Sequence, residues 1–309
     1  MNADTAFSRR QFLAASATTL LSPVARAESA PKGAVDAHVH IRTPDMDRYP
    51  LAPGRKKEDM KPESFTPEEL FAHAKPAGVG RIVLIQMSFY QYDNSYMLDA
   101  MRAHPGVFGG VAIIDENADG VPATMRSLGE RGVRGYRLYA NRENAAGWAS
   151  SDGIRTMWKT GAEIGQAMCL LANPDALPTI HSMCQAFPET TVVIDHFARI
   201  GASGTIEEGD LENLLRLAEF PAVHVKTSAF YALGKKAAPH DDLGPMIRRL
   251  RDAYGAERLM WATDCPYQVR KGHTYADSVA LIRDRLDFLS TEDKTWMLRK
   301  TAERVFFSS

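Results

Sequence analysis

The chain alternates eight times between a short apolar run and an amphipathic segment, and this alternation constrains its fold more than any other feature. Several of the runs are nearly continuous in Val, Ile and Leu, which is typical of parallel strands covered on both faces. The expected strands are Val35–Ile41, Arg81–Met87, Phe108–Ile114, Val133–Tyr139, Ala167–Ala172, Thr191–His196, Ala222–Ser228 and Leu259–Asp264. Eight strands that alternate with helices predict one α/β domain, a (β/α)8 TIM barrel.

Helical segments separate these strands. The first is predicted from Thr66, a good N-cap residue, and from Pro67 at the first helical position. The others cover Asn94–Ala103, Val121–Arg131, Ile154–Gly165, Leu177–Ala186, Leu211–Glu219, Leu243–Tyr254, Tyr275–Leu289 and Glu292–Phe306. A long polar insertion, residues 42–64, follows the first strand, and in a barrel we expect it to lie over the mouth at the carboxyl ends of the strands.

The first 27 residues have the pattern of an export signal rather than of a folded element. Ser8–Leu13 contains a twin arginine, Leu13–Val24 is a weakly apolar stretch, and Ala25-Arg26-Ala27 resembles a cleavage site. The apolar stretch is too short and too polar to span a bilayer, which needs about 20 apolar residues. We therefore expect residues 1–27 to be a signal peptide read by the twin-arginine export machinery, with residues 28–309 forming the barrel domain, periplasmic or secreted after cleavage near Ala27.

Composition narrows the classes of partner. The formal net charge is −1, which gives no indication of binding to nucleic acid or to an anionic membrane surface. The three cysteines do not form a disulfide framework. The chain has neither a dinucleotide-binding glycine motif nor a Gly-x-Ser-x-Gly elbow. A small-molecule substrate is the expected partner, and the sequence is compatible with a homo-oligomer.

Polar side chains stand at the ends of three expected strands. His38 and His40 lie two residues apart in the first strand, so both imidazoles share one face. His196 ends the sixth strand and is expected to share a face with Ile194, and Asp264 ends the eighth. Active sites of such barrels lie at the carboxyl ends of the strands. We therefore expect three histidines and one carboxylate to point into one mouth.

Three motifs carry a resemblance to a known family. They are Val35-Asp-Ala-His-Val-His40, Val193-Ile-Asp-His196 with Ala198-Arg199 just beyond it, and Trp261-Ala-Thr-Asp-Cys-Pro266. Together they resemble the amidohydrolase superfamily, and within it the amidohydrolase-related family with its lactonase-like branch, of the 2-pyrone-4,6-dicarboxylate lactonase type. The resemblance covers roughly residues 34–306 and implies a hydrolase on a TIM barrel.

Two departures from the family pattern bear on metal binding. The fifth strand, within residues 167–173, lacks the histidine of metal-dependent members, and the fourth, residues 133–139, lacks the lysine of two-metal members. The resemblance to the lactonase type therefore implies hydrolysis with no obligatory cofactor. The alternative is one divalent ion such as Zn²⁺, for which His38, His40 and Asp264 would be the ligands.

The same residues suggest a division of roles. Asp264 is the candidate general base for water, while His38, His40 and His196 are expected to polarise the carbonyl group. The substrate-binding candidates are Arg137, suited to gripping a carboxylate, and Ser88, Tyr90, Arg199, Lys226 and Tyr267.

The prediction that follows is a hydrolase that opens a small, carboxylated lactone. One alternative is a zinc-dependent decarboxylase of an aromatic or unsaturated acid on the same barrel. A second alternative is a non-catalytic periplasmic ligand-binding protein.

Overall fold

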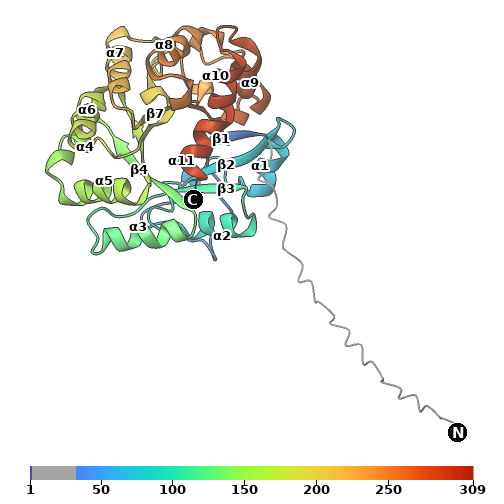
Figure 1. Cartoon of the computed structure of the whole chain (residues 1–309), viewed down its shortest axis with the longest axis vertical. Helices are drawn as coiled ribbons and strands as arrows, with labels where there is room; N and C mark the ends of the chain where they lie inside the picture. Colours follow the sequence, from blue (N-terminus) through green and yellow to red (C-terminus); the bar gives the residue numbers. More distant parts are fainter. Residues whose placement is uncertain (2–32, 309) are drawn as a thin grey trace. The chain divides into compact units, whose positions relative to one another are not determined.

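A computed structural model describes Met1 and residues 33–308; the predicted signal peptide, apart from Met1, lies outside the described residues. Eight parallel strands follow one another in chain order around a nearly closed barrel (Figure 1). The strands are β1 (Ala34–Val39), β2 (Val79–Ile85), β3 (Phe108–Ala112), β4 (Val133–Ala140), β5 (Ala167–Ala172), β6 (Val192–Ile194), β7 (Val223–Thr227) and β8 (Leu259–Trp261). The predicted TIM barrel is confirmed, although β6 and β8 end earlier than the sequence suggested.

Helices surround the strands and cover their outer faces. They are α1 (Pro67–Ala74), α2 (Ser95–Ala103), α3 (Val121–Glu130), α4 (Arg142–Ala145), α5 (Asp152–Ile164), α6 (Leu177–Ala186), α7 (Glu208–Arg216), α8 (Gly244–Tyr254), α9 (Tyr275–Ala280), α10 (Thr291–Thr295) and α11 (Thr301–Phe306). The short α4 was not predicted, and wider π turns at 281–285 and 296–300 follow α9 and α10. No described helix has the length and apolar character needed to cross a membrane.

Helix α11 seals one end of the barrel. Figure 1 shows it lying across the ring of strands. Its Ala302 and Phe306 pack in one buried cluster with Val35 of β1 and Met260 of β8, which point into the barrel. Because Val35 and Met260 stand near the starts of their strands, α11 closes the amino-terminal end of the barrel. The opposite end, where TIM-barrel sites form, stays open.

A β-bulge in β1 sets the direction of the His-x-His pair. Asp36 pairs with Ile82, whereas Val39 pairs with Leu84, so β1 has one more residue than β2 between the two pairs. A bulge of this kind re-aims the side chains that follow it. Val39 packs in the outer apolar layer, while the imidazoles of the flanking His38 and His40 point to the inside.

The carboxylate of Asp36 reinforces the seam where the barrel closes, because backbone pairing between β1 and the segment after β8 is short. Between β1 and the segment after β8 there is one isolated bridge, Val39 to Cys265. The fully buried Asp36 accepts hydrogen bonds from Thr263 N at 2.9 Å, from the Thr263 hydroxyl and from the Tyr275 hydroxyl at 2.6 Å. It thereby ties β1 to the residue that precedes Asp264.

The buried His224 lies away from the mouth and makes the stability of the barrel depend on pH. It lies on β7, buried, with Nδ1 3.1 Å from the Ala222 carbonyl oxygen, and burial lowers its pKa to about 4. The pKa of a histidine in the unfolded chain is about 6.5, so acid favours the unfolded chain. We predict that this group lowers the free energy of unfolding by about 3 kcal/mol as the pH falls from 6.5 to 4.

Urea unfolding at several pH values checks this expectation. His224→Gln should unfold with a shallower pH dependence between pH 6.5 and 4 than the wild type. His73→Gln, at an exposed position, serves as the control and should keep the wild-type slope. Equal slopes in all three proteins would contradict the prediction.

Candidate active site

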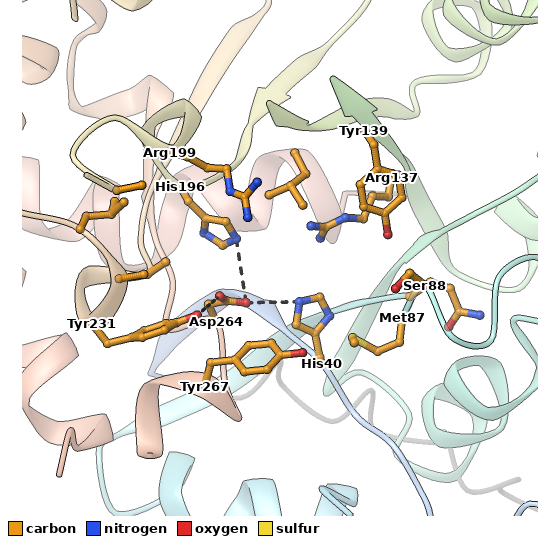
Figure 2. Close-up of a pocket in the computed structure, with 16 residues that line it drawn as sticks. His40, Met87, Ser88, Arg137, Tyr139, His196, Arg199, Tyr231, Asp264 and Tyr267 are labelled. Atoms are coloured by element: carbon orange, nitrogen blue, oxygen red, sulfur yellow. Dashed lines mark hydrogen bonds and ion pairs between the residues drawn. The ribbon is translucent and has the colours of Figure 1, made fainter. Parts of the chain in front are cut away.

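A cavity of about 410 Å³ opens at the carboxyl end of the barrel. Of the residues predicted from the sequence, seven line it: His40, Ser88, Arg137, His196, Arg199, Asp264 and Tyr267 (Figure 2). His38 and Lys226 are fully buried and do not line it. Tyr90 is also buried outside the lining, and its hydroxyl oxygen accepts a hydrogen bond from Thr43 N. The structure thus brings most of the predicted site together.

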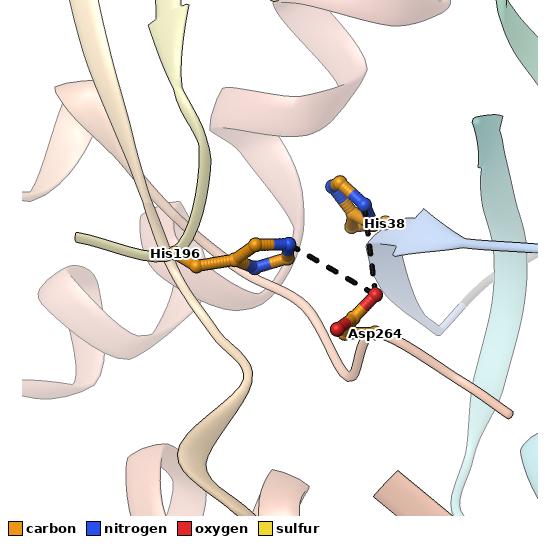
Figure 3. Close-up of side chains that lie close together, drawn as sticks. All are labelled: His38, His196 and Asp264. Atoms are coloured by element: carbon orange, nitrogen blue, oxygen red, sulfur yellow. Dashed lines mark ion pairs between the residues drawn. The ribbon is translucent and has the colours of Figure 1, made fainter. Parts of the chain in front are cut away.

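Three imidazoles surround one carboxylate oxygen (Figures 2 and 3). The Oδ1 atom of Asp264 lies 3.2 Å from His40 Nε2, 3.7 Å from His38 Nε2 and 3.9 Å from His196 Nε2. The Nε2 atoms of His38 and His40 are 3.3 Å apart. The constellation predicted from three strand ends therefore exists as one compact group.

His196 reaches this group by a different route from the one predicted. Val192 and Ile194 pack in the outer layer and Val193 in the barrel interior, so His196 does not continue an inward strand face. Instead the chain leaves β6 in a left-handed turn, with φ of 52° at His196 and positive φ through Arg199. Non-glycine residues in this region cost about 1–3 kcal/mol each and are typical of functional sites.

Hydrogen bonds at Nδ1 orient His40 and His196. His40 Nδ1 lies 2.9 Å from the Ile85 carbonyl oxygen, which can only accept, so Nδ1 carries the proton. His196 Nδ1 lies 2.7 Å from the Ser228 hydroxyl, which itself donates to the Lys226 carbonyl oxygen. Both rings therefore turn an unprotonated Nε2 towards Asp264.

His38 has a cationic donor at each ring nitrogen. The Arg137 guanidinium lies 3.2 Å from His38 Nε2, and the Lys226 ammonium lies 3.2 Å from His38 Nδ1. The Nδ1 atom also lies 3.3 Å from Asp195 Oδ1. Asp195 is itself paired with Lys226 Nζ at 3.0 Å and lies 3.7 Å from Arg137. This buried ion-pair cluster fixes the ring beneath the mouth.

Two residues that contribute to this geometry were not singled out from the sequence. Asp195 points inward because it follows Val193 by two residues, and this alternation was the signal that could have found it. Tyr231, in the loop after β7, donates a hydrogen bond of 2.7 Å to Asp264 Oδ2. No sequence pattern marks Tyr231, since its position depends on the path of that loop.

The charge states follow from burial and these contacts. Burial lowers the pKa of His38, His40 and His196, the last to about 4, so all three are neutral at pH 7. Burial alone would raise the pKa of Asp264, but the neighbouring His196 and His40 outweigh burial and hold that pKa below its usual range. An ionised carboxylate therefore faces three neutral rings.

This arrangement suits a bound cation. Asp264 Oδ1 is buried and has no hydrogen-bond donor among the described residues, and the Nε2 atoms of three histidines lie within 3.9 Å of it. Ligand atoms around a tetrahedral zinc lie about 3.3 Å apart, close to the separations among His38, His40 and Asp264. His38, His196 and Asp264 also offer ligand atoms that all lie within 4.8 Å of one another. The residues present fit one divalent ion.

Comparison with known proteins places these features in a family. The family model described as Amidohydrolase matches residues 35–307. The 4-sulfomuconolactone hydrolase of Rhizobium radiobacter is 27% identical over 238 residues, which cover 77% of each chain. The 2-pyrone-4,6-dicarboxylate hydrolase of Comamonas testosteroni is 28% identical over 258 residues, covering 81% of this chain and 82% of its own.

A solved structure shows the same fold. An amidohydrolase from Burkholderia multivorans with bound zinc superposes with a TM-score of 0.72 at 18% identity, covering 90% of this chain and all of its own.

Zinc binding is a direct test of the converging ligand atoms. We predict that the purified, chelator-treated protein binds one equivalent of Zn²⁺ in calorimetry and that binding raises its melting temperature, because an ion held only by the folded state stabilises it. Asp264→Asn and His196→Asn should each weaken the affinity at least tenfold. The exposed His73→Gln control should bind as the wild type does. Equal binding by all variants would exclude this site.

Proposed function

The chain belongs to the amidohydrolase family, and from this premise we propose that it hydrolyses the ester bond of a small lactone that carries an acidic group. The carrying observation is the carboxylate of Asp264, which lies among three histidines at the wall of a cavity that also contains Arg137 and Arg199. The two curated relatives act, by name, on a sulfonated and a dicarboxylated lactone, which supports an anionic substrate.

Asp264 is the proposed general base. Its Oδ2 accepts a hydrogen bond from the Tyr231 hydroxyl, while Oδ1 has no donor in the described part of the chain and faces the histidines. Oδ1 takes a proton from the water that attacks the lactone carbonyl carbon. When the bond between that carbon and the ring oxygen breaks, Asp264 returns the proton to the departing oxygen. The product is the open hydroxy acid or its keto form.

Polarisation of the carbonyl group needs a cation or a donor. The Nε2 atoms of His40 and His196 face the site as acceptors, so these two rings cannot donate to a developing oxyanion in this arrangement. Arg137 can donate from the cavity wall. A divalent ion held by His38, His40 and Asp264, with His196 beside it, would supply a Lewis acid at the same place.

The sequence favoured hydrolysis with no obligatory metal, whereas the closely spaced ligand atoms support the divalent ion. Metal analysis with rate measurements separates the two. If the ion is required, a chelator removes most of the turnover and Zn²⁺ restores it. Full turnover by protein shown to be metal-free would instead assign the polarising role to Arg137.

Replacement of the base tests the reaction. We predict that Asp264→Asn lowers kcat for the best lactone at least about 100-fold, as is usual when a general base is lost, with circular dichroism unchanged. The panel comprises 4-sulfomuconolactone, 2-pyrone-4,6-dicarboxylate, 2-pyrone-6-carboxylate and uncharged δ-valerolactone. The exposed Asp287→Asn is the matched control.

Two results would refute the proposal in different ways. Unchanged turnover by Asp264→Asn would remove Asp264 from the mechanism. Release of carbon dioxide from an aromatic or unsaturated acid, with no lactone cleaved, would make the protein a decarboxylase.

Replacement of Arg199 tests whether the substrate carries an acidic group. Arg199 is exposed at the mouth, and within residues 33–308 its one hydrogen bond to a side chain goes to Asn173 Oδ1, at 3.1 Å. A guanidinium without a carboxylate partner is suited to an anionic substituent. We predict that Arg199→Gln raises KM for the carboxylated lactone about tenfold and leaves KM for an uncharged lactone unchanged. An equal rise in KM for both lactones would show that Arg199 does not bind the acidic group of the substrate.

A further inference from the structure

A second cavity lies beside the mouth. Its volume is about 490 Å³, and it shares Ser88, Arg137 and Tyr139 with the first cavity. Figure 2 shows these three residues together, on the side of the mouth away from Tyr231. The rest of its wall comes from the loops that follow β2, β3 and β4 and from Arg55 of the long insertion. A molecule seated in the mouth can therefore extend into the second cavity past Tyr139.

Three aromatic side chains line this cavity among several polar ones. Tyr92 and Tyr139 are 46% and 40% exposed, and apart from Met1 they are the large apolar side chains that the described part of the chain leaves exposed. Both line the second cavity, together with the buried Trp148 and with Ile114. Exposed rings gathered around one hollow are suited to stacking on a flat, apolar group.

The charges of the cavity leave no excess for an ionic group. Arg55 and Glu116 line it with opposite signs. Arg137 already lies 3.7 Å from Asp195 and 5.3 Å from the centre of the Tyr139 ring. Asn144 accepts from Asn141 N through its Oδ1, which leaves its amide NH₂ group to face a neutral polar atom. The cavity therefore matches an uncharged ring.

We propose that the substrate carries, beside its lactone ring, an uncharged aromatic ring that occupies this second cavity against Tyr92 and Tyr139. The proposal rests on the lactone hydrolysis proposed above and narrows its substrate class to aryl-substituted lactones. The mouth then binds the lactone ester and the acidic group, while the loops after β2, β3 and β4 contact the second ring.

Matched lactones test the second ring. The parent is 2-pyrone-6-carboxylate, and the probes are its 3-, 4- and 5-phenyl derivatives. We expect at least one phenyl derivative to be hydrolysed with kcat/KM at least tenfold above that of the parent. If the parent is cleaved and no phenyl derivative gains, the second-ring proposal is wrong while lactone hydrolysis stands. If no lactone of either panel is cleaved, both proposals are wrong.

A substitution that fills the second cavity tests whether the phenyl group binds there. Gly147 lines the second cavity only, has φ of −85°, and an added Cβ there meets nothing within 4 Å. Gly147→Phe should therefore fold and occupy the space, so that the ratio of phenyl to parent kcat/KM falls to about one. Gly209→Phe, on α7, also meets open space and should keep the wild-type ratio.

Two substitutions at Tyr92 separate the ring from its hydroxyl group. Tyr92→Phe should keep the phenyl advantage, and Tyr92→Ala should lose most of it. A phenyl advantage that survives both Gly147→Phe and Tyr92→Ala would place the second ring elsewhere and overturn the proposal.

Discussion

The hydrogen bonds to the Asp36 carboxylate hold the site together. Strand pairing between β1 and the segment after β8 is reduced to one bridge, and Asp36 spans this seam to Thr263 and Tyr275. Both His38 and Asp264 are attached to the same seam, since Asp264 N donates to the His38 carbonyl oxygen at 2.9 Å. Burial raises the pKa of Asp36 to about 6 against the opposing effect of its donors. The chain thus keeps a costly buried carboxyl group where the two halves of the site meet.

Beneath the mouth, opposite charges are nearly matched. Asp195 pairs with Lys226 and lies close to Arg137, while Asp264 stands among neutral imidazoles. Two buried carboxylates thus face two buried cations, and Arg199 adds a positive charge at the rim. Lys226 belongs to this foundation rather than to the cavity lining. Its ammonium group lies 3.0 Å from Asp195 Oδ1 and 3.2 Å from His38 Nδ1, so Lys226 helps to hold both side chains in place.

Apolar periodicity and strand-end residues were sufficient to predict the barrel, because each strand is defined by its own local pattern. They also identified His38, His40, His196 and Asp264, since parallel strands must deliver their ends to one rim. The face of His196 was beyond that logic: four successive residues adopt positive φ, and strict alternation cannot anticipate them. The bulge in β1 is a property of its pairing with β2, and Tyr231 is placed by a loop. The features that the sequence did not predict are local backbone conformations that tertiary contacts impose on short segments.

The position of α11 has a consequence for the timing of folding during synthesis. Phe306 packs inside the barrel with Val35, residues separated by nearly the whole described chain, and the ring of Phe306 lies 5.3 Å from the ammonium group of Lys226. A ribosome releases β1 long before it has made α11. Without α11, the amino-terminal end of the barrel would lack the cover that Ala302 and Phe306 provide beneath the Lys226–Asp195 pair. The interior on which the site rests can therefore become dry only after residue 306 has emerged.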